Sequence, residues 1–263
     1  MTTPHSFPLE PTPIHVSDGV LDDLRARLAL TRAPLDEGNG DWSYGVPHSY
    51  LRKLVAYWRD GYDWRKAEAA TNAYEHYQVG VASVSVHFMR KPGRGPRPVP
   101  LILTHGWPWT FWHWSKVIDP LADPAAFGGD PADAFDVIVP SLPGFGFPGP
   151  LTGLPDVNFW KVSDLWHTLM TEVLGYEKYA AGGCDIGALV SSQLGHKYAD
   201  ELYGIHIGRS TSSPAPAPGT SPGIGPSPTT SPLTSAPASS NWTTARRPTS
   251  PCTCSTAPPW PTG

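Results

Sequence analysis

The 263-residue sequence has few of the features that mark several protein classes. Its three cysteines are too few for a disulfide scaffold and favour reduced thiols in a cytoplasmic protein. Only 16% of the residues are charged and the formal net charge is −4, so no basic surface indicates nucleic-acid binding. No apolar run approaches the roughly 20 residues of a membrane span, and the first residues lack the pattern of a signal peptide. We therefore expect a cytoplasmic protein with no nucleic-acid partner and no membrane anchor.

The last 55 residues, 209–263, differ sharply in composition from the rest. They contain 13 Pro, 11 Ser and 11 Thr, and they have no Asp, Glu, Lys, His, Tyr, Phe or Val. Such a stretch cannot bury enough apolar surface to offset its ordering entropy, so we expect a disordered tail. A natural linker and an interaction tail are two alternatives for its origin. The abrupt change after Gly208 favours a third, the product of a reading-frame shift that replaced the C-terminal part.

The first hundred residues combine a helical N-terminal segment with a strand. Apolar residues recur at helical spacing in three stretches, and Ser17 can cap the first of them. Valines and Phe88 then alternate with polar residues, which is typical of a strand. The predicted elements are helices over 17–30, 48–60 and 63–76, a strand over 84–88 and a loop over 92–100.

Strands and helices alternate after residue 100, which predicts an α/β fold with a mainly parallel sheet. The predicted strands are 101–103, 135–139, 179–182 and 202–207, and the predicted helices are 110–122, 160–174 and 186–198. In such sheets ligands bind beyond the carboxyl ends of the strands. We divide the chain into an N-terminal region (1–92), a partial core (93–208) and the tail (209–263).

The sharpest motif is the pentapeptide Gly183-Cys184-Asp185-Ile186-Gly187, between a predicted strand and a predicted helix. It has the spacing of the G-x-S-x-G nucleophile elbow, with Asp in place of Ser. The turn is so tight that only small residues fit two positions before and after its tip. A carboxylate there sits at a helix N-terminus, stays ionised and can attack carbon to form an ester. The alternative is an ordinary helix whose N-cap is Asp185.

The tetrapeptide His105-Gly106-Trp107-Pro108 follows the strand that ends near Thr104. In folds with a nucleophile elbow, one oxyanion-stabilising amide comes from the residue after the nucleophile and one from the loop after an earlier strand. The backbone amides of Ile186 and Trp107 are the candidates for these two positions. The alternative is a simple turn in which His105 is hydrogen-bonded in the core.

The loop from Pro140 to Phe147 follows the next predicted strand and is rich in Pro, Gly and Phe. Phe145 and Phe147 could form the wall of an apolar pocket together with Trp109, although a surface turn is equally consistent with the sequence. Cys184 is interpreted as a buried small residue rather than a reactive thiol. The Cys252-Thr253-Cys254 spacing is not a usual zinc pattern, so we expect no metal site.

Taken in this order, the motifs resemble those of the epoxide hydrolases of the α/β-hydrolase superfamily. The resemblance is greatest to the microsomal-type branch, which has its own N-terminal domain, and it covers about residues 6–208. It rests on the elbow, the His105 tetrapeptide, the Pro140–Phe147 loop and two N-terminal motifs. The latter are Trp42-Ser43-Tyr44-Gly45-Val46 and Tyr62-Asp63-Trp64-Arg65.

This resemblance implies that Asp185 is the nucleophile, which opens a small apolar epoxide through an ester intermediate to give a vicinal diol without a cofactor. It implies that Trp107 and Ile186 form the oxyanion hole and that a cis peptide precedes Pro108. Structural roles at the site are implied for His105, Gly106, Gly183 and Gly187.

The resemblance also implies that lid tyrosines, a catalytic His and its acidic partner follow the strand near 202–207, where this sequence has the tail. We therefore expect slow epoxide opening, crippled ester hydrolysis and an exposed sheet face or edge that favours aggregation. Two alternatives stay open: an inactive remnant or binding module, and a haloalkane dehalogenase, which Trp107 and Ile186 disfavour. The sequence leaves open which epoxide is bound, the stereochemistry, and whether the chain forms a homo-oligomer.

Overall fold

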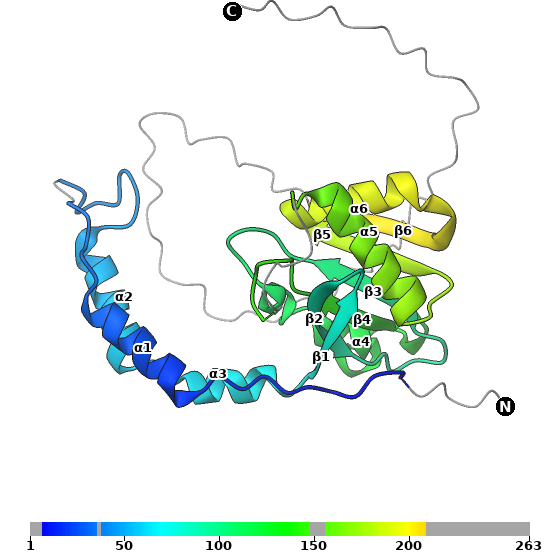
Figure 1. Ribbon diagram of the computed structural model, residues 1–263, viewed down its shortest axis with the longest axis horizontal. Helices are drawn as coiled ribbons and strands as arrows, with labels where there is room; N and C mark the ends of the chain where they lie inside the picture. The colour runs from blue at the N-terminus through cyan, green and yellow to red at the C-terminus, as the bar shows by residue number, and fades with distance from the viewer. Residues whose placement is uncertain (1–6, 36–37, 148–155, 209–263) are drawn as a thin grey trace, which may run out of the picture. The chain divides into compact units, whose positions relative to one another are not determined.

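A computed structural model describes residues 7–35, 38–147 and 156–208 (Figure 1). The described residues within Met1–Ser210 belong to one compact unit. The predicted tail, 209–263, lies outside the described residues, as do residues 148–155 of the stretch after Phe147.

A six-stranded sheet forms the centre of this unit, with the strand order β1-β2-β4-β3-β5-β6. The strands are β1 (Glu75–Val81), β2 (Val84–Lys91), β3 (Val99–Thr104), β4 (Phe135–Pro140), β5 (Tyr179–Cys184) and β6 (Leu202–Gly208). β4, β3, β5 and β6 run parallel to one another, whereas β1 and β2 form an antiparallel hairpin that joins the sheet beside β4. The predicted α/β fold with a mainly parallel sheet is confirmed.

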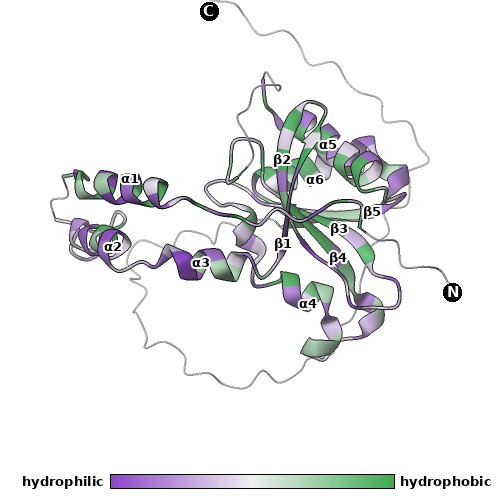
Figure 2. Cartoon of the chain, turned by 60° about the horizontal axis from the view of Figure 1, so that its bottom comes forward, coloured by the Kyte–Doolittle hydropathy of each residue, from purple (hydrophilic) through white to green (hydrophobic). Residues whose placement is uncertain are grey.

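Two apolar cores are built on this sheet, and different helices contribute to each. The helices are α1 (Asp18–Ala29), α2 (His48–Asp60), α3 (Trp64–Thr71), α4 (Ile118–Ala122), α5 (Phe159–Thr168) and α6 (Ile186–Lys197). The larger core combines α5 and α6 with strand side chains, and Trp166 at its centre is fully buried. The second core combines α4 and the 3-10 turn η1 (Phe111–Trp114) with other strand residues. Figure 2 shows α4 lying apart from α5 and α6.

The structure corrects the expected helix over 63–76. Helix α3 ends at Thr71, and β1 begins four residues later at Glu75. β1 was missed although its sequence alternates, with Tyr77 and Val81 buried on one face. The turn to β2 is Ala82-Ser83, where both residues have positive φ angles of 45° and 69°. Such hairpin turns usually contain Asn or Gly, so this one gives almost no signal in the sequence.

Two further predicted helices are each divided into two shorter elements in the structure. The expected helix over 110–122 is the short turn η1 followed by the five-residue α4, which contains Pro120. Proline lacks an amide donor and its ring clashes with the carbonyl four residues earlier, so a helix from residue 110 cannot continue through Pro120, whereas the first turn of α4 can contain it. The expected helix over 160–174 is α5 followed by a π-helical segment, η4 (Leu169–Val173).

The N-terminal helices begin close to where the sequence predicts, but their contacts differ from expectation. Ser17 is the N-cap of α1, yet its side chain makes no capping hydrogen bond. Helix α2 has a marked apolar face, but none of its residues is buried, and Leu54 and Trp58 are each 47% exposed. The central sheet includes strands on both sides of residue 92, since β1 and β2 precede that position. The division into an N-terminal region (1–92), a partial core (93–208) and a tail (209–263) stays a prediction.

Candidate functional site

Asp185 is the single residue between the end of β5 and the start of α6. Its backbone angles are φ 53° and ψ −119°, which lie in a region that glycine adopts far more readily than other residues. A non-glycine residue held in such a conformation costs roughly 1–3 kcal/mol and is found most often at functional sites. The geometry is therefore that of a strained turn with a carboxylate at its tip.

Three glycines make this turn sterically feasible. A Cβ atom on Gly187 would overlap the carbonyl oxygen of Thr104 at the end of β3. A Cβ on Gly183 would overlap the backbone of Gly187, and one on Gly106 would overlap the side chain of Asp185. The missing side chains thus let α6 approach β3 and let the carboxylate approach the loop after β3.

The loop after β3 contacts the Asp185 carboxylate directly. The backbone amide of Trp107 donates a hydrogen bond of 2.8 Å to Asp185 Oδ1. The loop is a tight turn, in which the amide of Trp109 donates to the carbonyl of Gly106 and the Trp107-Pro108 peptide bond is cis. Ile186 is the first residue of α6, so its amide is one of those that a helix cannot satisfy internally. Two residues 78 positions apart in the sequence are thereby joined at one point.

His105 is fully buried and holds this loop against the next one. Its Nε2 accepts a hydrogen bond of 3.1 Å from the amide of Leu142, in the loop after β4. Its Nδ1 lies 3.1 Å from the carbonyl oxygen of Gly106, which makes Nδ1 the protonated nitrogen. Burial lowers the pKa of His105, so the ring is neutral at physiological pH. The ring also contacts Phe145 edge-on, with centroids 5.6 Å apart.

The three predicted pocket residues lie in different surroundings. Trp109 is 57% exposed and contacts the ring of His113 edge-on. Phe145 packs on His105 and on the larger core. Phe147 contacts His87 and lines a cavity beside α3. The structure therefore joins Asp185 with the Trp107 loop but does not gather these aromatic side chains into one wall.

Cys184 and His113 are neighbours that the sequence did not connect. The Cys184 thiol is half-buried and lies 3.9 Å from His113 Nε2. Burial raises the pKa of this thiol, and the negative charge of Asp185 raises it further. The expectation that Cys184 is buried is therefore wrong, because its place at the end of β5 leaves the thiol partly accessible. That the thiol is unreactive stays a prediction, which the raised pKa favours.

A buried polar chain that the sequence analysis missed supports the loop after β4. Ser141 Oγ lies 2.9 Å from His87 Nδ1, and His87 Nε2 lies 3.0 Å from His76 Nδ1. His76 Nε2 in turn lies 2.9 Å from the carbonyl oxygen of Thr71. Because a carbonyl can only accept, His76 is protonated on Nε2, His87 donates to His76, and Ser141 donates to His87. The alternation of β1 gives a signal for His76, but the pairing across the hairpin does not follow from it.

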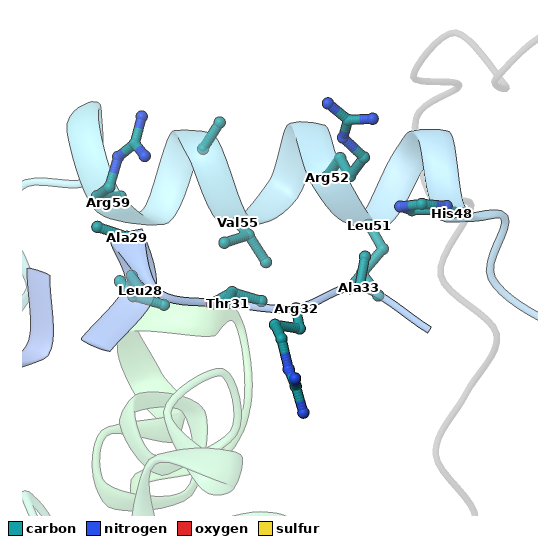
Figure 3. A pocket seen from close by; sticks show the side chains of 11 residues that line it. Leu28, Ala29, Thr31, Arg32, Ala33, His48, Leu51, Arg52, Val55 and Arg59 are labelled. Carbon is teal, nitrogen blue, oxygen red and sulfur yellow. The ribbon is translucent and has the colours of Figure 1, made fainter. Parts of the chain in front are cut away.

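A larger cavity, of about 560 Å³, lies between the end of α1 and helix α2 (Figure 3). Leu51 and Val55 of α2 face the segment that follows α1. The guanidinium groups of Arg32 and Arg52 point in opposite directions in this view, so they do not converge on a common anion. This cavity contains no group that was predicted to be functional.

Two further properties concern the described residues alone. No group of three or more His, Cys, Asp or Glu side chains within ranges 7–35, 38–147 and 156–208 could hold a metal ion. Within those same ranges, no helix has the length and apolar character that crossing a bilayer requires.

The sheet order, the strained turn after β5 and the loop after β3 define an α/β-hydrolase. A model of the "alpha/beta hydrolase fold" family matches residues 99–220, and a model of the "Epoxide hydrolase N terminus" family matches residues 9–114. The chain belongs to the epoxide hydrolase family. The matches favour this assignment over the haloalkane dehalogenase alternative.

Relatives of known name support the same family. One relative, from Stigmatella aurantiaca, is named as an epoxide hydrolase. It is 41% identical to this chain over 215 residues, and the match covers 81% of this chain and 48% of the relative. Epoxide hydrolase 1 of Oryctolagus cuniculus is 31% identical over 205 residues, covering 76% of this chain and 44% of its own. The chain therefore spans about half the length of the curated relatives it matches.

Solved structures give the same result. The juvenile hormone epoxide hydrolase of the silkworm Bombyx mori superposes with a TM-score of 0.65 at 28% identity, covering 77% of this chain and 53% of that one. The Aspergillus niger epoxide hydrolase superposes with a TM-score of 0.67 at 26% identity, covering 78% and 54%.

Proposed function

We propose that this chain carries the nucleophile and oxyanion site of an epoxide hydrolase, with Asp185 as the nucleophile. The observation that carries the proposal is the 2.8 Å hydrogen bond from the Trp107 amide to Asp185 Oδ1, at the tip of a strained turn. The side chain of Asp185 is exposed, so it is accessible to a substrate.

The first step forms an ester and opens the ring. An oxygen of the Asp185 carboxylate attacks one ring carbon, a carbon–oxygen bond forms, and the bond from that carbon to the epoxide oxygen breaks. The epoxide oxygen stays bonded to the other ring carbon as an alkoxide and takes a proton from water to become a hydroxyl group. The product of this step is a hydroxyalkyl ester of Asp185, and no cofactor is needed.

The second step releases a vicinal diol. Water adds to the ester carbonyl and loses a proton to the solvent, and negative charge develops on an oxygen of the Asp185 side chain. The amides of Trp107 and Ile186 would stabilise that oxygen, as preorganised donors do in acyl transfer. Breaking the ester bond then releases the diol and regenerates the carboxylate. The glycines 106, 183 and 187 act by letting these groups approach one another.

We further propose that the second step is the slow one in this chain. All ten histidines precede Gly208, and residues 209–263 contain no His, Tyr, Asp or Glu. Of the two histidines near the turn, His105 is neutral and has both nitrogens engaged, and His113 lies beside the thiol of Cys184. Loss of a general base commonly slows a reaction by roughly 10²- to 10⁴-fold. We therefore propose that the ester accumulates.

The test is incubation of the purified chain with styrene oxide, a small apolar epoxide, followed by intact-mass measurement and assay of the diol. We expect a single covalent adduct on the wild-type chain and none on Asp185→Asn, with diol formed far more slowly than adduct. The variant Asp164→Asn changes a carboxylate on α5 that pairs with Lys197 and serves as the control. Equal labelling of wild type and Asp185→Asn would refute the proposal that Asp185 is the nucleophile. Sustained diol turnover would refute the proposal that hydrolysis of the ester is slow.

A further inference from the structure

A second cavity lies beside α3, between that helix and the loops after β3 and β4. It has a volume of about 280 Å³ and is lined mainly by apolar side chains. Its aromatic and aliphatic walls are Tyr62, Trp64, Phe111, Trp112, Phe147 and Ile14. We refer to it as the α3 cavity. An apolar cavity of about 150 Å³ is already large enough to bind benzene, so this one has room for a two-ring aromatic molecule.

The walls of the α3 cavity that come from α3 are held in place by hydrogen bonds. Glu68 Oε1 accepts a bond of 2.7 Å from the amide of Val16 and one of 3.2 Å from the indole of Trp64. Asn72 makes two bonds with the backbone of Ile14, of 2.9 Å and 2.8 Å. Helix α3 is thereby fastened to the segment that precedes α1. A cavity whose walls are fixed before binding costs less to occupy than one that must be assembled.

The floor of the α3 cavity is equally well supported. Phe111 is 3% exposed, and its ring contacts both His76 and His87 edge-on. Phe147 contacts the His87 ring in the same manner, with centroids 5.7 Å apart. The buried chain from Ser141 to Thr71 thus lies directly behind the aromatic floor. Aromatic rings packed on a rigid support offer faces and edges suited to another aromatic ring.

Charge restricts the ligand that this cavity accepts. Glu68 belongs to the lining and is 8% exposed. The Val16 amide, with further donors from Arg65 and Trp64, holds the pKa of Glu68 at about 2, so the carboxylate is ionised at neutral pH. Arg65 pairs with Glu68 at 2.7 Å and also with Asp18, so these three groups together carry a net charge of −1. This charge repels an anionic ligand, and a charged ligand of either sign would lose its hydration among the apolar walls, so a neutral ligand is favoured.

We propose that the α3 cavity is a binding site for a neutral aromatic molecule of one or two rings, separate from Asp185. The site needs no chemistry from the strained turn, and the proposal therefore does not rest on the proposed function. Rings of this kind would pack against Trp64, Phe111 and Phe147, and a hydroxyl group on the ligand would lie near Thr110, which also belongs to the lining.

The test is calorimetric titration of the full chain with 1-naphthol and, separately, with the anion 1-naphthoate. We expect 1-naphthol to bind, and 1-naphthoate to bind at least about tenfold more weakly, which corresponds to about 1.4 kcal/mol. Ala67 lines the cavity, so Ala67→Phe should weaken 1-naphthol binding by at least about tenfold. Ala69 lies on the same helix, is exposed and is not part of the lining, so Ala69→Phe is the matched control and should bind like wild type.

Further outcomes separate this site from the strained turn. Asp185→Asn should bind 1-naphthol like the wild type, whereas loss of binding in Asp185→Asn alone would place the ligand at the turn and overturn the proposal. Absence of 1-naphthol binding by the wild type, or equal binding of naphthol and naphthoate, would overturn it as well, and neither measurement depends on whether a variant folds. Unchanged binding by a folded Ala67→Phe, checked by circular dichroism, would also overturn it.

Discussion

Asp185 has backbone angles that resemble those of the first central residue of a type II′ turn, where glycine dominates. An aspartate at this position, which the proposed chemistry needs, therefore lowers the stability of the folded chain. The neighbouring glycines reduce that cost by removing clashes, but they cannot remove the strain inside Asp185 itself. At this residue, function and stability should favour different amino acids.

This conflict predicts an unusual order of stabilities. Glycine normally destabilises a protein relative to alanine, but here we expect Asp185→Gly to be more stable than Asp185→Ala by about 1 kcal/mol. Both variants lose the hydrogen bond from Trp107, so their difference isolates the backbone conformation. Urea denaturation of the two variants measures it. A more stable alanine variant would show that the positive φ angle carries no strain.

The packing of Gly187 gives a second prediction at this scale. A Cβ there would overlap the Thr104 carbonyl, so we expect Gly187→Ala to lower the free energy of unfolding by about 1–3 kcal/mol. The control is Gly204→Ala on β6, where a Cβ meets no atom within 4 Å, and it should be neutral or stabilising by up to about 1 kcal/mol. Thermal denaturation compares the two. Equal melting temperatures would contradict the close approach of α6 to β3.

Much of the candidate site follows from single residues. The spacing of Gly183, Asp185 and Gly187 demands a tight turn, and the structure has one there. The sequence could not show which partners face the turn, because contacts such as Trp107 with Asp185 depend on how β3 and β5 pair. It also could not show that Phe145 and Phe147 lie in different surroundings, because side-chain directions in an irregular loop follow no sequence periodicity.

At the scale of elements, the β1–β2 hairpin and the loop after β4 are joined by the chain from His76 through His87 to Ser141. Burial, reinforced by the nearby His76, lowers the pKa of His87 to about 3, against 6.5 in the unfolded chain. Between these values the unfolded chain binds a proton that the folded chain does not. Stability should therefore fall as the pH falls from about 6.5 towards about 3.

The prediction concerns the variant His87→Gln, which keeps a polar side chain but cannot titrate. Between about pH 6.5 and about pH 4.5, we expect wild type to lose about 2–3 kcal/mol more stability than the variant. Urea denaturation at a series of pH values gives both curves. Parallel curves would mean that His87 titrates equally in the folded and unfolded chains, contrary to its burial.

The elements could be predicted where the pattern of apolar residues extends over many positions. The parallel strands β3 to β6 and helix α6 lie close to their predicted ranges, because buried apolar runs and small-residue turns define them. The errors fall on short elements. β1 follows a helix within four residues and turns on Ala82-Ser83, and α4 has only five residues, so neither leaves a pattern long enough to separate from its neighbours.

At the scale of the whole molecule, β6 forms one edge of the sheet within the part of the chain that the structure describes. Tyr203, Ile205 and Ile207 alternate along it and are 61%, 39% and 42% exposed. An apolar edge strand is a template for pairing with another chain. This feature agrees with the expected exposed edge, whereas aggregation itself stays a prediction.

We expect the chain to self-associate, and Ile207→Lys to reduce that association several-fold because a charged edge opposes strand pairing. Val20 on α1 is 58% exposed but does not belong to the sheet, so Val20→Lys is the control and should behave like wild type. Sedimentation velocity over a range of concentrations measures the effect. Equal reduction by both variants would indicate a general effect of charge rather than association through β6.

The central claim is that the Asp185 carboxylate, rather than the adjacent Cys184 thiol, attacks the epoxide. The most direct test is peptide mapping of the styrene oxide adduct by tandem mass spectrometry, with Cys184→Ser and Asp185→Asn in parallel. We expect an ester on Asp185 that mild alkali removes, that persists in Cys184→Ser and that is absent from Asp185→Asn. An alkali-stable adduct on Cys184 that remains in Asp185→Asn would contradict the claim.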